Sequence, residues 1–265
     1  MVVKQILCKS ALSLSTLPGL TYSLNPYRGC QHNCAYCYAP NVLRIQREHW
    51  GDIVEAKTNI PVILSQELKH KKHGAVGIST VTDPYQPLEQ KYMLTRYCLE
   101  QLLSYDFPAH IQTKSALVLR DIDLVSRFSD AQVMMSIGTL DDMQRKIVEP
   151  GSSSIQERLE VLKRYSDVGV QTSVFFGPIY PTVTREDVST ILDDFIEHGA
   201  SEIWIDSLRL KPGIWDGVKK RIAPIPGMYQ TFSKHIIEQK TYYQTIREEI
   251  LKAGKQKNVK IIDAF

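Results

Sequence analysis

Short apolar segments that alternate with amphipathic helical stretches constrain the fold of this chain more than any other feature. The apolar segments are rich in β-branched residues and have the length of buried strands. They span residues 75–80, 110–113, 132–137, 170–176 and 202–205. The stretches 88–104, 155–165 and 188–196 each carry a single apolar stripe at helical spacing. Strands that alternate with helices through short connections predict repeated βα units and a mainly parallel sheet.

A first strand near residues 21–24 brings the total to about six strands, and the repeated βα units favour a barrel. The sequence therefore predicts an α/β fold, a partial (β/α)6 TIM-like barrel with a parallel sheet. A doubly wound open sheet is the alternative. No Gly-x-Gly-x-x-Gly motif follows any predicted strand, which counts against a dinucleotide-binding fold. In either architecture the chemistry lies at the carboxyl ends of the strands.

Cysteine usage and the N-terminal segment indicate a compartment. Five cysteines in 265 residues, an odd number, suit a reducing cytoplasm rather than a secreted disulfide scaffold. The N-terminal apolar residues are interrupted by Lys4, Gln5, Lys9 and Ser10, so they lack the apolar region of a signal peptide. No segment approaches the length that spans a membrane. We expect a soluble, cytoplasmic protein with no membrane partner.

The charge of the chain is nearly balanced. Lysine and arginine number 32 against 29 acidic residues, a net charge of +3, which predicts no strong sequence-independent attraction to nucleic acid. Two basic clusters stand out, residues 69–73 and residues 219–221 with Lys211 nearby. Each is typical of a solvated surface, and contact with nucleic acid is the alternative.

Three cysteines, Cys30, Cys34 and Cys37, lie within eight positions after the first predicted strand. Three thiolates so close together repel one another unless they are protonated or share a metal. A disulfide staple, a zinc knuckle and an iron–sulfur cluster site are the competing interpretations. Structural zinc needs four ligands, and the only nearby candidate for the fourth is His32. An iron–sulfur cubane differs, because three cysteines can hold three irons and leave the fourth iron open for a ligand.

The other two cysteines do not complete a four-cysteine site. Cys8 lies far upstream, and Cys98 lies on an apolar helix stripe, where a buried core thiol is the expected role.

The spacing Cys-x-x-x-Cys-x-Tyr-Cys resembles the signature of the radical S-adenosylmethionine (SAM) enzymes. The resemblance implies that Cys30, Cys34 and Cys37 hold a [4Fe-4S] cluster whose open iron is chelated by SAM, and that Tyr36 lies against the adenine. One electron delivered to the SAM sulfonium then releases methionine and a 5′-deoxyadenosyl radical. No second cysteine cluster is present, so we expect an external electron donor such as ferredoxin or flavodoxin.

Further motifs are similar to the spore photoproduct lyase-like branch, often labelled DNA repair photolyase. They lie at residues 25–29, 80–87, 113–115, 120–121, 149–150 and 177–181. The resemblance covers about residues 20–210. Because no stretch rich in Pro, Gly or Ser is long enough for a linker, we expect a single radical SAM domain over residues 1–265 with its core at about 20–210. Residues 211–265, which the resemblance does not cover, are expected to form a C-terminal helical extension that packs on the barrel. Within that extension, residues 232–251 are predicted to be a helix.

The chain departs from spore photoproduct lyase at one position that matters. That family carries a cysteine after the second strand, where this chain reads Ser79-Thr80-Val81-Thr82-Asp83, although Tyr38 matches the family's tyrosine. Thymine-dimer repair by the same mechanism is therefore not expected. The predicted function is abstraction of hydrogen from an unidentified substrate. The alternatives are a related nucleic-acid repair or modification enzyme, or a zinc- or nucleic-acid-binding protein without radical chemistry.

Residues that follow the predicted strands are the remaining site candidates. The resemblance implies that Lys114 contacts the SAM carboxylate, that Ser136 hydrogen-bonds the same ligand, and that the turn at Pro178 lies over the adenosine. Arg158 follows the capping box Ser154-x-x-Glu157, so its charge opposes the helix dipole. It therefore needs an anionic partner, which is a SAM carboxylate or, as a structural alternative, Glu149 or Glu157.

Two further groups complete the predicted site. The second strand ends in residues that are candidates for binding the cofactor, with an ordinary turn as the alternative: Thr80, Thr82 and Asp83. After the sixth strand, Asp206 and Arg209 face the same rim and are better candidates for the substrate than for SAM. Together with Tyr38, these two residues are the predicted catalytic group.

Overall fold

A computed structural model describes residues 2–264 of the chain. Its main sheet has eight strands in the order β11-β10-β9-β8-β7-β6-β3-β2. The six central strands pair in parallel. They are β3 (Tyr22–Leu24), β6 (Val76–Ile78), β7 (Ala109–Thr113), β8 (Ala131–Ser136), β9 (Gln171–Phe176) and β10 (Glu202–Ile205). These are the six strands that the sequence predicts, so the α/β class and the mainly parallel sheet are confirmed.

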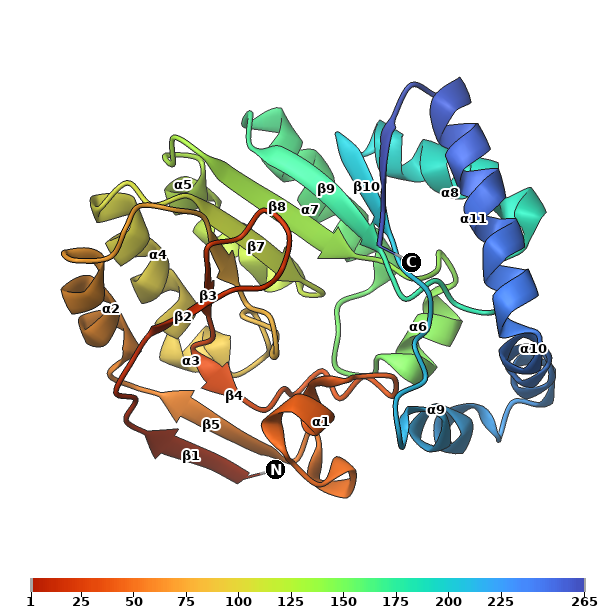
Figure 1. The fold of residues 1–265 in the computed structure, drawn as a ribbon, viewed down its shortest axis with the longest axis horizontal. Helices are drawn as coiled ribbons and strands as arrows, with labels where there is room; N and C mark the ends of the chain where they lie inside the picture. The colour runs from red at the N-terminus through yellow and green to blue at the C-terminus, as the bar shows by residue number, and fades with distance from the viewer. Residues whose placement is uncertain (1, 265) are drawn as a thin grey trace.

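Two edge strands extend the sheet beyond the predicted set. β2 (Leu12–Leu14) is antiparallel to β3, and β11 (Lys260–Asp263) is parallel to β10. Within residues 2–264 the strand order is linear, with no pairing that joins β2 to β11. Figure 1 shows the strands as an open, twisted sheet, which is a partial rather than a closed barrel.

The connecting helices pack against the sheet as βα units require. α7 contacts β8 and β9, and α2 packs against α4. The helices between the central strands are α2 (Ile60–Leu68), α3 (Glu89–Tyr92), α4 (Leu94–Ser104), α5 (Ile122–Val125), α6 (Asp142–Val148), α7 (Ile155–Asp167) and α8 (Arg185–Glu197), with a 3-10 turn η2 (Ala116–Asp121). The capping box predicted at Ser154 is present at the start of α7. The predicted helix over 88–104 is two helices, because Met93 adopts a left-handed conformation with φ 52°.

A small N-terminal sheet, which the sequence did not predict, supports the cysteine loop. Its strand order is β1 (Val2–Ile6), β5 (Ile53–Lys57) and β4 (Tyr27–Arg28). Between β4 and the cysteines, Gly29 has φ 91°, and a Cβ there would lie 2.4 Å from the carbonyl oxygen of Ile53. Only glycine lets the chain pass so close to β5 in this conformation. The segment between the cysteines and β5 holds α1 (Ala39–Leu43) and η1 (Arg47–His49).

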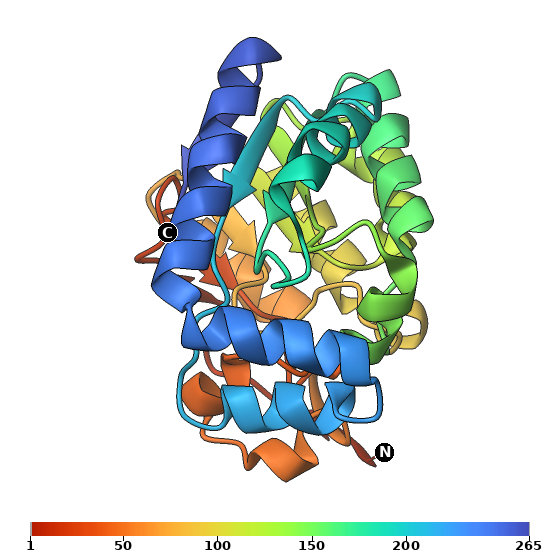
Figure 2. The same cartoon turned by 90° about the vertical axis from the view of Figure 1, so that its right-hand side faces the viewer.

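The C-terminal extension is helical up to its final strand. It consists of α9 (Ile214–Ile222), α10 (Pro226–Ile237), α11 (Gln239–Gln256) and then β11. The helix predicted over 232–251 spans two helices, and α11 packs against α8. Figure 2 shows α9 and α10 side by side below the sheet, with α11 rising along its edge. Among the described residues, no helix has the length and apolar character needed to cross a membrane.

Candidate functional site

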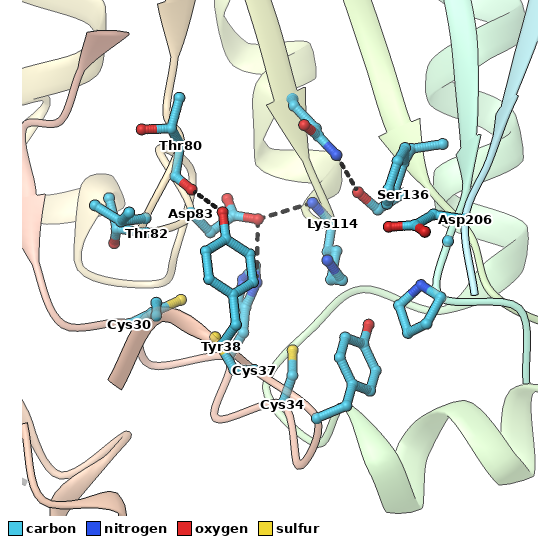
Figure 3. Close-up of a pocket in the computed structure, with 18 of the residues that line it drawn as sticks. Cys30, Cys34, Cys37, Tyr38, Thr80, Thr82, Asp83, Lys114, Ser136 and Asp206 are labelled. Atoms are coloured by element: carbon cyan, nitrogen blue, oxygen red, sulfur yellow. Dashed lines mark hydrogen bonds and ion pairs between the residues drawn. The ribbon is translucent and has the colours of Figure 1, made fainter. Parts of the chain in front are cut away.

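A cavity of about 360 Å³ lies where the carboxyl ends of the parallel strands meet the cysteine loop. This volume falls in the range of ligand pockets, which is about 300–1,000 Å³. Thirteen of the fourteen predicted site residues line it, and the fourteenth, Arg158, does not. The thirteen are Cys30, Cys34, Tyr36, Cys37, Tyr38, Thr80, Thr82, Asp83, Lys114, Ser136, Pro178, Asp206 and Arg209. Figure 3 shows the three sulfur atoms below the strand-end side chains.

Backbone hydrogen bonds hold the cysteine loop in place. The amide of Ala35 donates to the carbonyl of Val148 at 2.8 Å, and the guanidinium of Arg47 donates to the carbonyl of Cys37 at 2.9 Å. A Cβ at Gly151 would lie 2.4 Å from the carbonyl oxygen of Gln31. The loop is therefore fixed by contacts to segments far away in the sequence.

Burial raises the pKa of all three thiols. The pKa of Cys30 is raised to about 12 by burial and by the neighbouring Asp83 carboxylate. The pKa of Cys34 is raised well above its ordinary value by burial and by Glu149. The thiols are therefore protonated at neutral pH, and a metal that binds them must displace protons.

The donor set fits an iron–sulfur cluster. Three thiol groups on one loop line one cavity, and soft thiolate ligands suit iron–sulfur clusters. No group of three or more His, Cys, Asp or Glu side chains within residues 2–264 stands at metal-binding distance. The fit thus rests on the shared loop, the shared cavity and the donor chemistry. The thiol of Cys98, by contrast, is fully buried away from the cavity, as predicted for a core residue.

Asp83 joins three parts of the site. Its carboxylate accepts hydrogen bonds from the Thr113 hydroxyl at 2.6 Å and from the Lys114 amide at 2.8 Å. It lies 3.2 Å from Nδ1 of His32, which is in the cysteine loop. Burial alone would raise the pKa of Asp83, but His32 and the hydrogen bonds hold it far below its ordinary value. The carboxylate is ionised and its acceptor sites are used, which gives Asp83 a positioning role.

Arg158 lies behind the cavity rather than in it. Its fully buried guanidinium donates to Glu149 at 2.6 Å and to the carbonyl of Ser136 at 2.7 Å. Of the anionic partners predicted for Arg158, the structure therefore supplies Glu149. Arg158 is thus paired with Glu149 and does not line the cavity, while a contact with the cofactor stays an untested prediction.

Glu149 also accepts a hydrogen bond from the Tyr36 hydroxyl. Burial would raise the pKa of Glu149, but Arg158 and Lys114 outweigh it and lower the pKa to about 2. Glu149 thus links the residue between two cysteines to helix α7, a role that the sequence motif at 149–150 did not reveal.

Lys114 brings a positive charge into the cavity. Its Nζ lies 5.8 Å from the centre of the Tyr36 ring. Burial would lower the pKa of Lys114, but Cys34 and Glu149 raise it above its ordinary value. The ammonium group is therefore protonated, and Lys114 lines the cavity, while its contact with the SAM carboxylate stays a prediction.

Polar groups surround the mouth of the cavity. The Tyr38 hydroxyl donates to the carbonyl of Thr80 at 2.6 Å, yet 44% of Tyr38 is exposed. Burial raises the pKa of Asp206, and the Arg209 guanidinium 3.0 Å away opposes that shift. Lys211 lies 5.5 Å over the Tyr38 ring.

Two other predicted residues are engaged in hydrogen bonds. The Thr82 hydroxyl donates to the carbonyl of Gly29 at 2.6 Å, and the Ser136 hydroxyl accepts from Gln112 at 3.3 Å. These bonds fix the strand ends to the cysteine loop and to each other.

Several lining residues were not predicted from the sequence: Trp50, Gln112, Phe175, Lys211 and Ile214. The sequence shows Lys211 near a basic cluster, but no sequence pattern predicts that Lys211 lies beside Tyr38. The others are ordinary core or strand residues by type, and only the fold brings them to the cavity.

Residues from the motifs at 25–29, 80–87 and 120–121 also build a buried polar network behind the cavity. The Tyr27 hydroxyl donates to Glu89 at 2.5 Å, and Arg120 donates to the same carboxylate at 2.7 Å. Arg120 also pairs with Asp121 at 2.8 Å, and Asp121 accepts from the Tyr85 hydroxyl at 3.0 Å. The tyrosines and charged residues of these motifs were the only sequence signal for this network. In the structure these residues support the site from behind.

The open parallel sheet and the thiol loop at its carboxyl edge define a class of α/β protein with a cysteine-lined cavity. The family model of the radical SAM superfamily matches residues 24–195. The chain belongs to the radical SAM superfamily.

Proteins of Methanocaldococcus jannaschii and of a Pseudomonas phage are similar to this chain. The uncharacterized protein MJ0683 of Methanocaldococcus jannaschii is 30% identical over 258 residues, which cover 97% of this chain and 95% of that protein. A radical SAM Nalpha-GlyT isomerase of Pseudomonas phage M6 is 23% identical over 206 residues, which cover 75% of this chain and 42% of the isomerase.

Solved structures of spore photoproduct lyase share the fold. One variant matches with a TM-score of 0.74 at 14% identity and covers 99% of this chain and 82% of the lyase. Another, with bound AdoMet and dinucleoside spore photoproduct, matches with a TM-score of 0.63 at 14% identity over 83% of this chain and 66% of the lyase. At this identity the likeness concerns the fold, and the superfamily implies SAM and a [4Fe-4S] cluster.

Proposed function

We propose that the protein is an enzyme in which a [4Fe-4S] cluster supports reductive cleavage of SAM to a 5′-deoxyadenosyl radical that abstracts hydrogen from a substrate. The observation that carries the proposal is the convergence of the three-cysteine loop and the strand ends on one cavity. Membership of the radical SAM superfamily supports it.

In this proposal Cys30, Cys34 and Cys37 hold the cluster, and they must lose their thiol protons to do so. Lys114 offers its protonated amine to the SAM carboxylate, and Tyr36 lies beside the adenine. Glu149 holds the Tyr36 hydroxyl and Asp83 holds the cysteine loop, so both position groups that bind the cofactor.

The mouth of the cavity is the proposed substrate end. Tyr38, Asp206 and Arg209 line it, and of these three only Tyr38 carries a hydroxyl group. Residues 79–83, which directly follow β6, contain no cysteine, so we assign the role of hydrogen donor to Tyr38. Asp206 and Arg209 form a pair that can orient a polar substrate.

The proposal includes one domain and one partner. Residues about 20–210 form the core, and residues 211–264 pack on it and bring Lys211 and Ile214 to the cavity. An electron carrier such as ferredoxin or flavodoxin supplies the electron.

The experiment that tests the function measures 5′-deoxyadenosine. The protein is reconstituted anaerobically with iron and sulfide, then incubated with SAM and dithionite, and the products are separated by chromatography. We expect 5′-deoxyadenosine from the intact protein and none from the Cys34→Ala variant. A fully reconstituted protein that leaves SAM intact would overturn the proposal.

A nucleic-acid substrate is the second candidate. Lys211 places positive charge over the Tyr38 ring in a cavity that Arg209 also lines, an arrangement that suits a base and its phosphate. The bound dinucleoside in the similar lyase structure supports this substrate class.

This second candidate is tested by hydrogen transfer. The reconstituted protein is incubated with SAM, dithionite and an oligonucleotide that carries deuterated thymidine, and the 5′-deoxyadenosine is examined by mass spectrometry. Deuterium in the 5′-deoxyadenosine would support abstraction from thymidine. Unlabelled product formed at the same rate with and without the oligonucleotide would count against it.

A further inference from the structure

Two segments far apart in the sequence cover the outer side of the cysteine loop. We define the α1–α9 surface as residues 39–49, which hold α1 and η1, together with helix α9. A Cβ on Gly217 of α9 would lie 2.9 Å from the carbonyl oxygen of Ala35, so the helix backbone rests directly on the loop. Arg221 of the same helix donates to the carbonyl of Asn33 at 3.5 Å. Figures 1 and 2 show α1 and α9 next to each other on this side.

The α1–α9 surface is basic. Its charged residues are Arg44, Arg47, Lys219, Lys220 and Arg221 against Glu48 and Asp216. These five cations and two carboxylates give a formal charge of +3, which equals the net charge of the whole chain. The rest of the chain is therefore balanced, and the excess positive charge lies beside the thiol loop.

Three of the five cations of this surface are exposed, and the other two are hydrogen-bonded to the cysteine loop. Arg44, Lys219 and Lys220 are exposed, and none of them forms an ion pair within residues 2–264. Arg47 and Arg221 are half-buried, and each donates to a carbonyl of the cysteine loop. The surface thus presents exposed lysines at its edge and hydrogen-bonded arginines next to the loop.

The other sides of the cysteine loop are occupied. One side faces the cavity, which in the proposed function holds SAM and substrate. Another is covered by the segment after α6, where the amide of Gly151 donates to the carbonyl of His32 at 3.1 Å. The α1–α9 surface is the remaining approach, and at Gly217 only one layer of backbone separates it from the loop.

We propose that the α1–α9 surface docks an acidic one-electron carrier protein of the flavodoxin or ferredoxin type. This inference rests on the proposed function, because cleavage of SAM requires one electron that the chain cannot supply from a second cluster. The carrier is oxidised by one electron and the cluster held by the cysteine loop is reduced by one. No bond forms or breaks at the surface. Complementary charge speeds such encounters and makes them sensitive to salt.

Charge-reversal variants test the docking surface. Lys219→Glu/Lys220→Glu changes the charge of the surface by −4, and Lys69→Glu/Lys72→Glu makes the same change at the end of α2. Figure 1 places α2 on the opposite side of the molecule from α9. All four lysines are exposed, so neither variant disturbs the core. The control therefore separates a local effect from an effect of net charge.

The measurement is calorimetric binding of a purified flavodoxin and of a purified ferredoxin at low and high salt. We expect one of these carriers to bind, the α9 variant to bind it at least about tenfold more weakly, and the α2 control to change the affinity about twofold or less. Rising salt should weaken the binding of the intact protein.

Three results would overturn the docking surface: no binding of either carrier, equal losses in the two variants, or unchanged binding in the α9 variant. Capture of a DNA or RNA duplex by the same lysines without any binding of a carrier would assign the surface to nucleic acid instead. Dithionite-driven cleavage of SAM is measured in parallel on each variant. Its absence from every protein would refute the proposed function, while the binding data still decide the docking surface.

Discussion

Asp83 shows how one buried side chain can organise a site. Its carboxylate accepts from the amide of Tyr85, from the hydroxyl of Thr113 and from the amide of Lys114. It also faces His32 of the cysteine loop. These contacts join the ends of β6 and β7 to the loop that carries the thiols.

Replacing Asp83 with asparagine should destabilise the protein by about 2–4 kcal/mol, because an amide nitrogen would face donors in a buried site. The matched control is Asp206→Asn at the cavity mouth, which should change the free energy of unfolding by less than about 1 kcal/mol. Urea unfolding at neutral pH measures both. Equal losses in the two variants would contradict the positioning role of Asp83.

Glu149 makes the free energy of unfolding depend on pH in the acidic range. The folded pKa is lowered from 4.5 to about 2, so the stability it contributes is present above pH 4.5 and is lost as the pH falls toward 2. Between pH 6 and pH 3 this carboxylate alone should account for a loss of roughly 2 kcal/mol. Urea unfolding over this range should show a shallower pH dependence for Glu149→Gln than for the unsubstituted protein. Parallel curves would show that Glu149 is not the titrating group.

Cys34 and Cys98 form a matched pair for the cluster assignment, because both thiols are buried but only Cys34 lines the cavity. Cys34→Ala should lose iron on anaerobic reconstitution, whereas Cys98→Ala should retain it and lose about 1–2 kcal/mol of stability from the small cavity created. Iron and sulfide assays on the two purified variants decide the point. Full iron content in Cys34→Ala would contradict the assignment.

At the scale of the elements, the six central strands were predictable and the accessory ones were not. Buried apolar side chains recur along β7 to β10, as they do in the core strands of a parallel sheet. β1 has the sequence VVKQI with no buried residue, and β11 has KIID with none either, so neither carries the apolar signal of a core strand.

The cavity was predictable because strand ends converge, and Glu149 was one of the partners predicted for Arg158. The docking of α9 on the cysteine loop was not predictable, because it joins segments whose proximity no local pattern encodes. Sequence motifs marked many of the residues involved, but only the fold shows which of them support the site and which line it.

The contact between α9 and the cysteine loop predicts that replacing Gly217 with alanine destabilises the protein, the opposite of the usual effect in a helix. Alanine normally stabilises a helix relative to glycine by about 0.5–1 kcal/mol. Gly227 in α10 has no neighbour within 4 Å of a Cβ, so Gly227→Ala should stabilise the protein by that amount. Gly217→Ala should destabilise it instead, because its Cβ would press on the carbonyl of Ala35. Thermal unfolding of the two variants should therefore shift in opposite directions, and a shift upward in both would refute the close packing.

At the scale of the whole molecule, the two ends of the chain complete the site that the central sheet begins. The N-terminal sheet supports the cysteine loop from one side, and the C-terminal extension covers it from another and adds Lys211 and Ile214 to the cavity. The extension is anchored by buried residues of α9 and α11 and by β11, which continues the main sheet. The cavity is therefore a product of the entire chain rather than of the central repeats alone.

We propose that the cysteine loop holds a cluster that binds SAM. Electron paramagnetic resonance of the anaerobically reconstituted, dithionite-reduced protein, recorded with and without SAM, tests this. We expect the signal of a reduced [4Fe-4S] cluster whose shape changes when SAM is added, and no such signal from Cys34→Ala. A cluster signal that is the same with and without SAM, or a protein that takes up zinc and no iron, would contradict it.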